Sequence, residues 1–482
     1  MKPPESDVSR LLHYSDQLAV ALQLADSLII LLLLATLLFA ITYFYFTGRQ
    51  PAIAYVLATY TPFQNVILPL ILASTVLPAA AGIALITLKD SLLLCGLLFC
   101  LVHVSRISIQ RVDILGLLFI AFLFSNLILS DSGAGPSLRA FRSFSVPVLL
   151  YFFGRLSLQS NQQIQSFVKW SLGLSVIVMI VASIDYVFVV ALHESMLPSP
   201  QDQLSDFYGH IGSQETYIYS KGFLGSVPKL VGPFGNNLIT AAYLRAIICI
   251  FIFYLVQSKK TLRFAQFIFL TALFAVSALT LSRFTIGALY LIGFLLVIQD
   301  RLWSVTGKVL TVASVVFATA LAWNILAEVA TTTLNVEDES THGHVSSIVV
   351  LGEMELTVFG HGLGFDADTG GLTRALKGEG YIRQFMPELG IFGIALFLSF
   401  AASVVLALVR FRDLSISNIR NLPGRFWIAL PLIIEILHTP IDTGIQSFLA
   451  NGLVWFLVGA VISAERLAVQ PGGENSRDVV PV

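Results

Sequence analysis

A polar stretch between two apolar runs, residues 342–385, carries the side chains best suited to chemistry. Near its end Glu379 and Arg383 are four residues apart, so in a helix they would share one face. Arg374 and Lys377 add positive charge just before them. A carboxylate can accept a proton from a hydroxyl, and the planar fork of arginine fits phosphate oxygens. The pattern therefore indicates a base beside phosphate-binding cations, although a solvated helix start would give the same spacing.

The same stretch contains the glycine-rich sequence GHGLG at 360–364, with His361 inside it. Glycines at this density are typical of a tight turn with positive φ angles. They also let backbone N–H groups approach an anionic oxygen. The triplet from Asp366 to Asp368 has the spacing of a metal-binding pair of carboxylates, but a solvated loop is the simpler interpretation. No metal site is expected.

A few ionisable residues lie within apolar runs. Glu435, His438 and Asp442 are spaced at i, i+3 and i+7 near the end of one run, and Asp185 lies inside another. Such groups are costly in a membrane unless they are paired or face a cavity. The pattern leaves two interpretations open: these residues line a site, or they satisfy one another.

Composition determines the scaffold that must position these residues. The 482 residues are 56% hydrophobic and 12% charged, with a mean hydropathy of +0.83. Soluble domains carry about 25% charged residues. Apolar runs near the length of a bilayer span recur throughout, which predicts one all-α polytopic membrane domain over 1–482 with about 12–14 transmembrane helices. The net charge of −1 gives no indication of nucleic-acid binding.

The expected spans and their direction follow from the apolar runs and the basic loops. Lysine and arginine cluster at 259–263, 301–308 and 410–425, which predicts that these loops are cytoplasmic. Loops 193–237 and 328–385 then lie on the outer face. The expected spans are 27–46, 65–88, 91–105, 114–130, 143–157, 167–192, 238–257, 264–281, 285–299, 309–327, 386–409, 426–441 and 445–463.

Three arginines depart from this charge bias. Arg139, Arg142 and Arg283 fall on the outer face, where arginine is uncommon. One interpretation is a local error in topology or side chains that extend to the interface. The other is an anion held at the outer surface.

Four short patterns occur in the same order as in a known family. They are GPFGNNLITAAYL at 232–244, LTLSRFTIGALYL at 279–291, LTVFGHGLG at 356–364 and GEGYIRQFMPELGIFGIALFL at 378–398. With the long outer loop three spans before the C-terminus, this order resembles the O-antigen polymerase and ligase superfamily. The resemblance covers roughly residues 110–463, and it rests on order and spacing because each pattern is short.

The resemblance implies a reaction at the outer leaflet of a bacterial inner membrane, with the active site facing the periplasm. A glycan on undecaprenyl pyrophosphate is transferred to a sugar hydroxyl of a second lipid-linked unit, without a cofactor or metal. The loop exit carries Glu379 where ligases carry histidine, which favours a polymerase over a ligase. The implied partners are lipid-linked glycans and the bilayer, with room for a chain-length regulator or export complex.

The resemblance also implies roles for individual residues. Glu379 is the expected base, with His344 as a second polar contact or as a loop histidine bonded to the backbone. The expected substrate-binding residues are Arg142, Arg283, Arg374, Arg383, Asn236 and His361.

The sequence allows three alternatives to a polymerase: a ligase, a transporter and a structural subunit. A ligase would move finished glycan to another acceptor. A transporter of lipid-linked oligosaccharide would place ionisable residues in broken helices at mid-membrane and would show repeated halves. This chain shows no repeated halves, and its polar residues gather in outer loops. A structural subunit of an export complex would leave the outer arginines unexplained.

Overall fold

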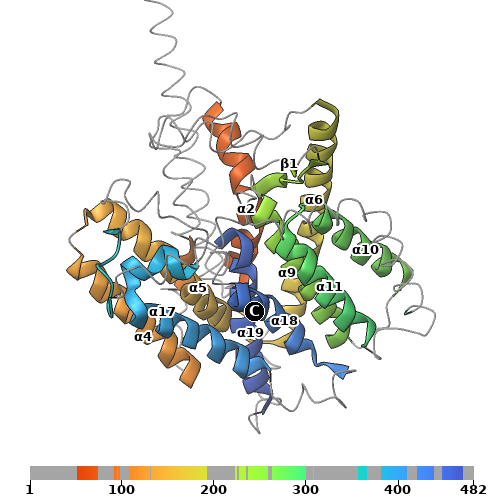
Figure 1. Cartoon of the computed structure of the whole chain (residues 1–482). Helices are drawn as coiled ribbons and strands as arrows, with labels where there is room; N and C mark the ends of the chain where they lie inside the picture. Colours follow the sequence, from red (N-terminus) through yellow and green to blue (C-terminus); the bar gives the residue numbers. More distant parts are fainter. Residues whose placement is uncertain are drawn as a thin grey trace, which may run out of the picture.

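The protein is a bundle of helices with one short pair of strands, as the computed structural model shows (Figure 1). The structure describes residues 51–73, 92–94, 96–97, 109–130, 132–192, 223–224, 227–234, 237–258, 263–299, 308, 357–365, 381–409, 421–438 and 448–469, some of them for the backbone only. The helices are α2 (Pro51–Ala73), α4 (Arg111–Leu129), α5 (Ala134–Ser157), α6 (Asn161–Leu192), α9 (Asn237–Gln257), α10 (Phe264–Ala278), α11 (Arg283–Val297), α17 (Tyr381–Leu408), α18 (Gly424–His438) and α19 (Phe448–Val469).

The all-helical class is confirmed for these residues, apart from the two-residue strands β1 (Phe223–Leu224) and β2 (Val227–Pro228), which pair antiparallel. Within the described ranges, four helices are long and apolar enough to cross a membrane: Arg111–Leu129, Asn161–Val187, Asn237–Gln257 and Met386–Leu408. This is the architecture of a membrane-embedded helical protein.

Most expected spans coincide with helices in the structure, and several of these helices begin before the expected first residue of the span. Residues 65–73 of the span expected at 65–88 belong to a helix that already begins at Pro51, where proline in the first turn gives up no hydrogen bond. Residues 74–88 lie outside the described residues. The span expected at 386–409 is confirmed as the candidate span Met386–Leu408, inside a helix that begins at Tyr381. The expected spans 27–46 and 309–327 lie outside the described residues.

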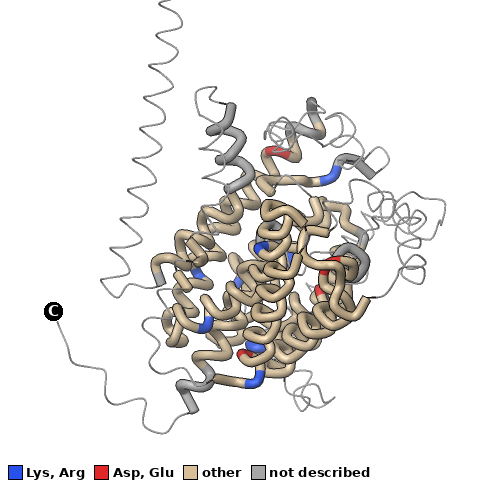
Figure 2. The backbone as a smooth tube through the Cα atoms, turned by 90° about the vertical axis from the view of Figure 1, so that its left-hand side faces the viewer, with Lys and Arg blue, Asp and Glu red and all other residues tan. Residues whose placement is uncertain are grey.

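Helix α9 lies at the centre of the bundle. It is apolar on all sides and buried over most of its length, with α6, α10, α18 and α19 packed around it. The outward faces of α4, α6, α10, α11 and α17 instead carry exposed large apolar side chains. Figure 2 shows how few charged residues the described bundle contains. Exposed apolar faces on this scale suit contact with lipid.

The helices α5 and α19 cross with their backbones in direct contact. A Cβ atom on Gly154 would overlap the carbonyl of Phe456, and one on Gly459 would overlap the carbonyl of Tyr151. Small residues allow this close approach, which is how helices pack where no hydrophobic effect drives them together. The centroids of the Phe153 and Phe456 rings lie 5.4 Å apart across the two helices. The crossing fixes α5, and with it the connection from α4.

A buried ion pair joins α4 to α5 at the end of the bundle remote from the α4–α5 connection. Asp113 lies 2.9 Å from the Arg155 guanidinium and accepts a hydrogen bond from the Tyr151 hydroxyl, also at 2.9 Å. The backbone N–H of Gln110 donates to the same carboxylate at 2.7 Å. The carboxylate therefore caps α4 and neutralises Arg155 at the same time.

We expect Asp113→Asn to lower the free energy of unfolding by about 2 kcal/mol, because a hydrogen bond to a charged group is lost and Arg155 stays buried with a weaker partner. Thermal unfolding of the purified protein in detergent measures this. The exposed Lys169→Ala on α6 is the control, with an expected change within about 0.5 kcal/mol. Equal effects of the two variants would contradict a stabilising role for the pair.

Candidate functional site

The GHGLG segment is a tight turn in which alternate glycines have positive φ angles. The angle is 76° at Gly360, 100° at Gly362 and 83° at Gly364. Residues with a side chain rarely adopt this conformation. The interpretation of 360–364 as a glycine-dependent turn is therefore confirmed.

Helix α17 is interrupted beside this turn. Gly390 has φ 64° and ψ −179°, which divides the helix into segments 381–389 and 391–408. The N–H groups of Ile391 and Phe392 donate to the carbonyls of Thr357 and Val358, at 3.1 and 3.0 Å. In the other direction, the N–H of His361 donates to the carbonyl of Pro387 at 2.7 Å. The loop thus supplies the partners that the interruption removes from the helix.

The turn and the interrupted helix touch backbone to backbone at Gly360 and Gly390. A Cβ atom on Gly360 would overlap the carbonyl of Glu388 and would lie 2.8 Å from the nitrogen of Gly390. A Cβ atom on Gly390 would overlap the nitrogen of Gly360 in turn. Both positions therefore need glycine for space as well as for conformation.

The other side of the turn packs on the connection between α4 and α5. The carbonyl of Leu363 accepts hydrogen bonds from Ser130 Oγ at 2.6 Å and from Ser137 Oγ at 2.9 Å. The Leu363 side chain is fully buried. A Cβ atom on Gly364 would lie 2.7 Å from the Ser137 nitrogen. We call the three joined segments, 130–137, 357–365 and 387–392, the loop junction.

Two of the expected site residues are at or near the loop junction. His361 belongs to it: the side chain is exposed and its ring stacks on Phe365 at 4.5 Å. Arg142 is half-buried on α5, about 12 Å along the helix from Ala134 at the usual rise per residue. Arg383 lies in the first turn of α17, where the structure describes the backbone only.

The remaining expected residues fall elsewhere. Glu379, His344, Arg374 and Asn236 lie outside the described residues, as do Asp366, Asp368 and Asp442. Arg283 is the first residue of α11, again with the backbone alone described. Helix α11 packs on α9 and α10, whereas α5, which carries Arg142, packs mainly on α4 and α19.

The loop junction also contains a carboxylate that the sequence did not single out. Glu388 is buried, with 7% of its surface exposed, two residues before the interruption at Gly390. The signal available in the sequence was an acidic residue inside an otherwise apolar run, in MPELG. A buried carboxylate in a membrane protein is a candidate functional group by default.

A second polar cluster joins α9, α11 and α18. Arg245 of α9 forms a buried ion pair with Glu435 of α18 and donates from Nη1 to Thr285 Oγ1 at 3.0 Å. Its guanidinium carbon lies 5.2 Å from the centre of the Phe284 ring, on which His438 stacks at 3.4 Å. The partner of Glu435 is therefore a residue that the spacing of Glu435 and His438 does not predict.

The turn between α10 and α11 is held from several sides. Leu281 has a positive φ of 50°, which is strained for a residue with a side chain. The carbonyl of Leu279 accepts from the Leu230 N–H at 2.8 Å, and that of Thr280 accepts from Asn237 Nδ2 at 3.1 Å. Asn237 thus ties the start of α9 to this turn.

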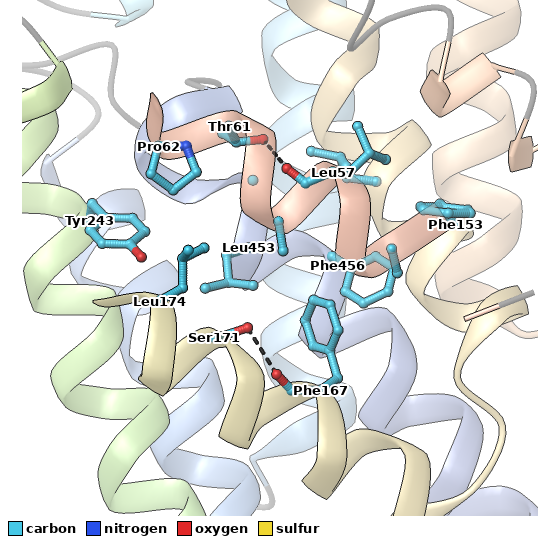
Figure 3. A pocket seen from close by; sticks show the side chains of 14 residues that line it. Leu57, Thr61, Pro62, Phe153, Phe167, Ser171, Leu174, Tyr243, Leu453 and Phe456 are labelled. Carbon is cyan, nitrogen blue, oxygen red and sulfur yellow. Dashed lines mark hydrogen bonds between the residues drawn. The ribbon is translucent and has the colours of Figure 1, made fainter. Parts of the chain in front are cut away.

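A mostly apolar pocket lies between α2, α5, α6, α9 and α19 (Figure 3). Its wall includes Phe153, Phe167 and Phe456, and the hydroxyls of Thr61 and Ser171 donate to carbonyls of their own helices. None of the described residues in its lining carries a charged side chain. It does not supply the polar groups that a transfer reaction needs.

The chain was also compared with known proteins. No protein-family model, no curated protein and no solved structure matches it. The family resemblance of the four sequence patterns therefore stays a prediction.

Proposed function

We propose that this chain is a membrane glycosyltransferase that polymerises oligosaccharide repeat units carried on undecaprenyl pyrophosphate, at the outer leaflet of a bacterial inner membrane. The product would be an O-antigen, capsule or exopolysaccharide chain. The proposal includes about 12–14 transmembrane helices in the whole chain, in keeping with the number of apolar runs of bilayer length.

The loop junction is the observation that carries the proposal. It anchors the polar loop at one end of the bundle, between the start of α5 and the interruption in α17. Glu379 comes two residues before the first residue of α17, so the anchor limits how far its backbone lies from the membrane-embedded helices. A large polar loop fixed in this way can hold a base above lipid-borne substrates.

The arginines support the same proposal. Arg142 follows the junction on α5, and Arg383 lies in the first turn of α17. Arg283 begins α11, and helices that alternate in direction would bring it to the same face of the membrane. A pyrophosphate leaving group needs such cations, since its negative charge grows as the bond breaks.

The reaction needs no redox partner. The hydroxyl oxygen of the acceptor sugar attacks the anomeric carbon of the donor, and a new C–O bond forms. The bond between that carbon and the phosphate oxygen breaks, and the pair of electrons leaves with the lipid pyrophosphate. Glu379 takes the hydroxyl proton, while the arginines bind the departing phosphates. The chain's own part is to align two long substrates and to exclude competing water.

The glycans of a strain that lacks the chain test the proposal. Accumulation of single lipid-linked repeat units, with long polymer lost, would support it. Long polymer that stays on the carrier would identify a ligase instead. Repeat units held at the inner leaflet would identify a transporter. Either of these two results would overturn the polymerase.

We expect Glu379→Ala to lower polymer formation by at least about 100-fold, because general-base catalysis contributes that much. Complementation of the deletion strain, with polymer normalised to folded protein, measures the loss. The double variant Asp366→Ala with Asp368→Ala is the control for loop damage, and we expect it to make polymer.

Glu388→Gln separates the two candidate carboxylates. If Glu388→Gln stops polymer formation and Glu379→Ala does not, the base is Glu388 of the loop junction and the assignment to Glu379 is wrong. If both variants make normal polymer, neither carboxylate is the base.

A further inference from the structure

We propose that the buried Arg245–Glu435 pair positions Arg283 by fixing the turn that begins α11. The inference rests on the proposed function only for what Arg283 binds, the pyrophosphate. The positioning itself stands on the contacts around the turn. Arg245 and Glu435 are positioning residues in this scheme, since neither is assigned a contact with substrate.

The pair holds the two residues that directly follow Arg283. Arg245 donates to Thr285 Oγ1 at 3.0 Å and its guanidinium faces the Phe284 ring at 5.2 Å. Arg245, Glu435 and Thr285 are all nearly fully buried, at 3%, 2% and 1% exposed. His438 of α18, the helix that also carries Glu435, stacks on the Phe284 ring.

The residues before Arg283 are also held in place, by a helix cap and by hydrogen bonds to their carbonyls. Ser282 caps α11 by accepting from the Thr285 N–H at 3.4 Å. Leu281 is kept at φ 50° while the carbonyls of Leu279 and Thr280 are bonded to Leu230 and Asn237. Strained residues persist only where their surroundings over-determine them, and they gather at functional sites. Arg283 is thus bracketed on both sides by fixed backbone.

Stability alone does not account for this pair. Removing two charges from water often costs more than their attraction returns, so an apolar replacement of a buried pair is frequently neutral or stabilising. What an apolar pair could not do is hold Glu435, Thr285 and Phe284 around one planar group. The guanidinium fork has donors for two partners at once, which the point charge of lysine does not reproduce.

Arg245→Lys separates positioning from charge balance. The variant keeps the positive charge opposite Glu435 but loses the planar fork, in which one nitrogen reaches Glu435 and a second reaches Thr285. A pair that only balances charge would tolerate the change. A pair that positions the turn would not. The matched control is Arg155→Lys in the buried ion pair with Asp113. That pair joins α4 to α5 at the end remote from their connection.

Hydrogen–deuterium exchange of the full-length protein in detergent is the deciding measurement. We expect the backbone amides of residues 279–286 to exchange about tenfold faster in Arg245→Lys, since exchange follows local opening. Arg155→Lys should leave those amides unchanged. Unchanged exchange at 279–286 in Arg245→Lys would overturn the inference, as would an equal increase in Arg155→Lys. Thr285→Val, which removes only the acceptor, should reproduce about half of the effect on a logarithmic scale.

Polymer formation then tests the part that rests on the proposed function. With exchange raised, we expect Arg245→Lys to make about tenfold less polymer per folded protein, because misplacing a phosphate ligand slows transfer. If exchange rises but both Arg245→Lys and Arg283→Ala make normal polymer, the turn is positioned as inferred and the role of Arg283 in the proposed function is wrong.

Discussion

Replacing Gly360 with alanine should detach the polar loop from α17 and stop polymer formation in a protein that still inserts. The new Cβ would overlap the carbonyl of Glu388, and the backbone φ of 76° is unfavourable for alanine. Strain and overlap together should cost about 3 kcal/mol. The N–H groups of Ile391 and Phe392 would also lose their acceptors as the loop shifts. Thermal unfolding and the glycan profile of a complemented strain measure the two effects.

Gly135→Ala is the matched control for this variant. Gly135 lies in the first turn of α5, within segment 130–137 of the loop junction, and a Cβ atom there would meet nothing within 4 Å. Its expected change in stability is below about 1 kcal/mol, with full polymer formation. If Gly360→Ala unfolds at the wild-type temperature and makes normal polymer, the contact between the turn and α17 has no importance for folding or activity.

Gly459→Leu should prevent folding altogether. Its side chain would have to occupy the space taken by the Tyr151 carbonyl at the crossing of α5 and α19. Neither backbone can retreat, since the carbonyl of Phe456 meets Gly154 in the same way on the other helix. Overlap between two backbones in a close-packed interior costs more than about 4 kcal/mol. The yield of monodisperse protein after size-exclusion chromatography is the measurement.

Gly287→Leu is the control for Gly459→Leu, because it adds the same side chain at another glycine. Gly287 lies on an exposed face of α11 and a Cβ atom there would meet nothing within 4 Å. Lipid accommodates a leucine at such a position, so the yield should match the wild type. A normal yield of Gly459→Leu would mean that α5 and α19 do not cross at these glycines.

The sequence predicted the helices well because bilayer thickness sets the length of an apolar run, and α9 and α17 are runs of that length. It predicted the turn at 360–364 because glycines at alternate positions are typical of a tight turn with positive φ angles. It did not predict the interruption at Gly390. A glycine inside an apolar run is common in membrane helices, and only a partner for the exposed backbone groups makes an interruption stable. That partner is Thr357–Val358, far away in the chain.

The partners in the buried ion pairs could not be predicted from the sequence, for a related reason. Arg245 and Glu435 are each a charged residue inside an apolar run, where an unpaired charge is costly. The two residues that neutralise each other are 190 positions apart in the chain. Nothing in the local spacing identifies which helix faces which. The Ser130 and Ser137 contacts with Leu363 are similarly long-range, at 233 and 226 positions. The candidate base and Arg374 lie outside the described residues, and Arg283 and Arg383 are described for the backbone only, so those predictions stand untested.

The interruption in α17 also has a consequence for the order in which the chain is made. Residues 391–392 are synthesised after the carbonyl acceptors at 357–358 and after Leu363, while Ser130 and Ser137 are synthesised before all of these. The acceptors thus exist before the second segment of α17 reaches the lipid. An N–H group left bare in hydrocarbon costs several kcal/mol. The loop that precedes α17 can therefore act as a docking template for its biogenesis, and a deletion of residues 357–365 should harm membrane insertion as well as catalysis.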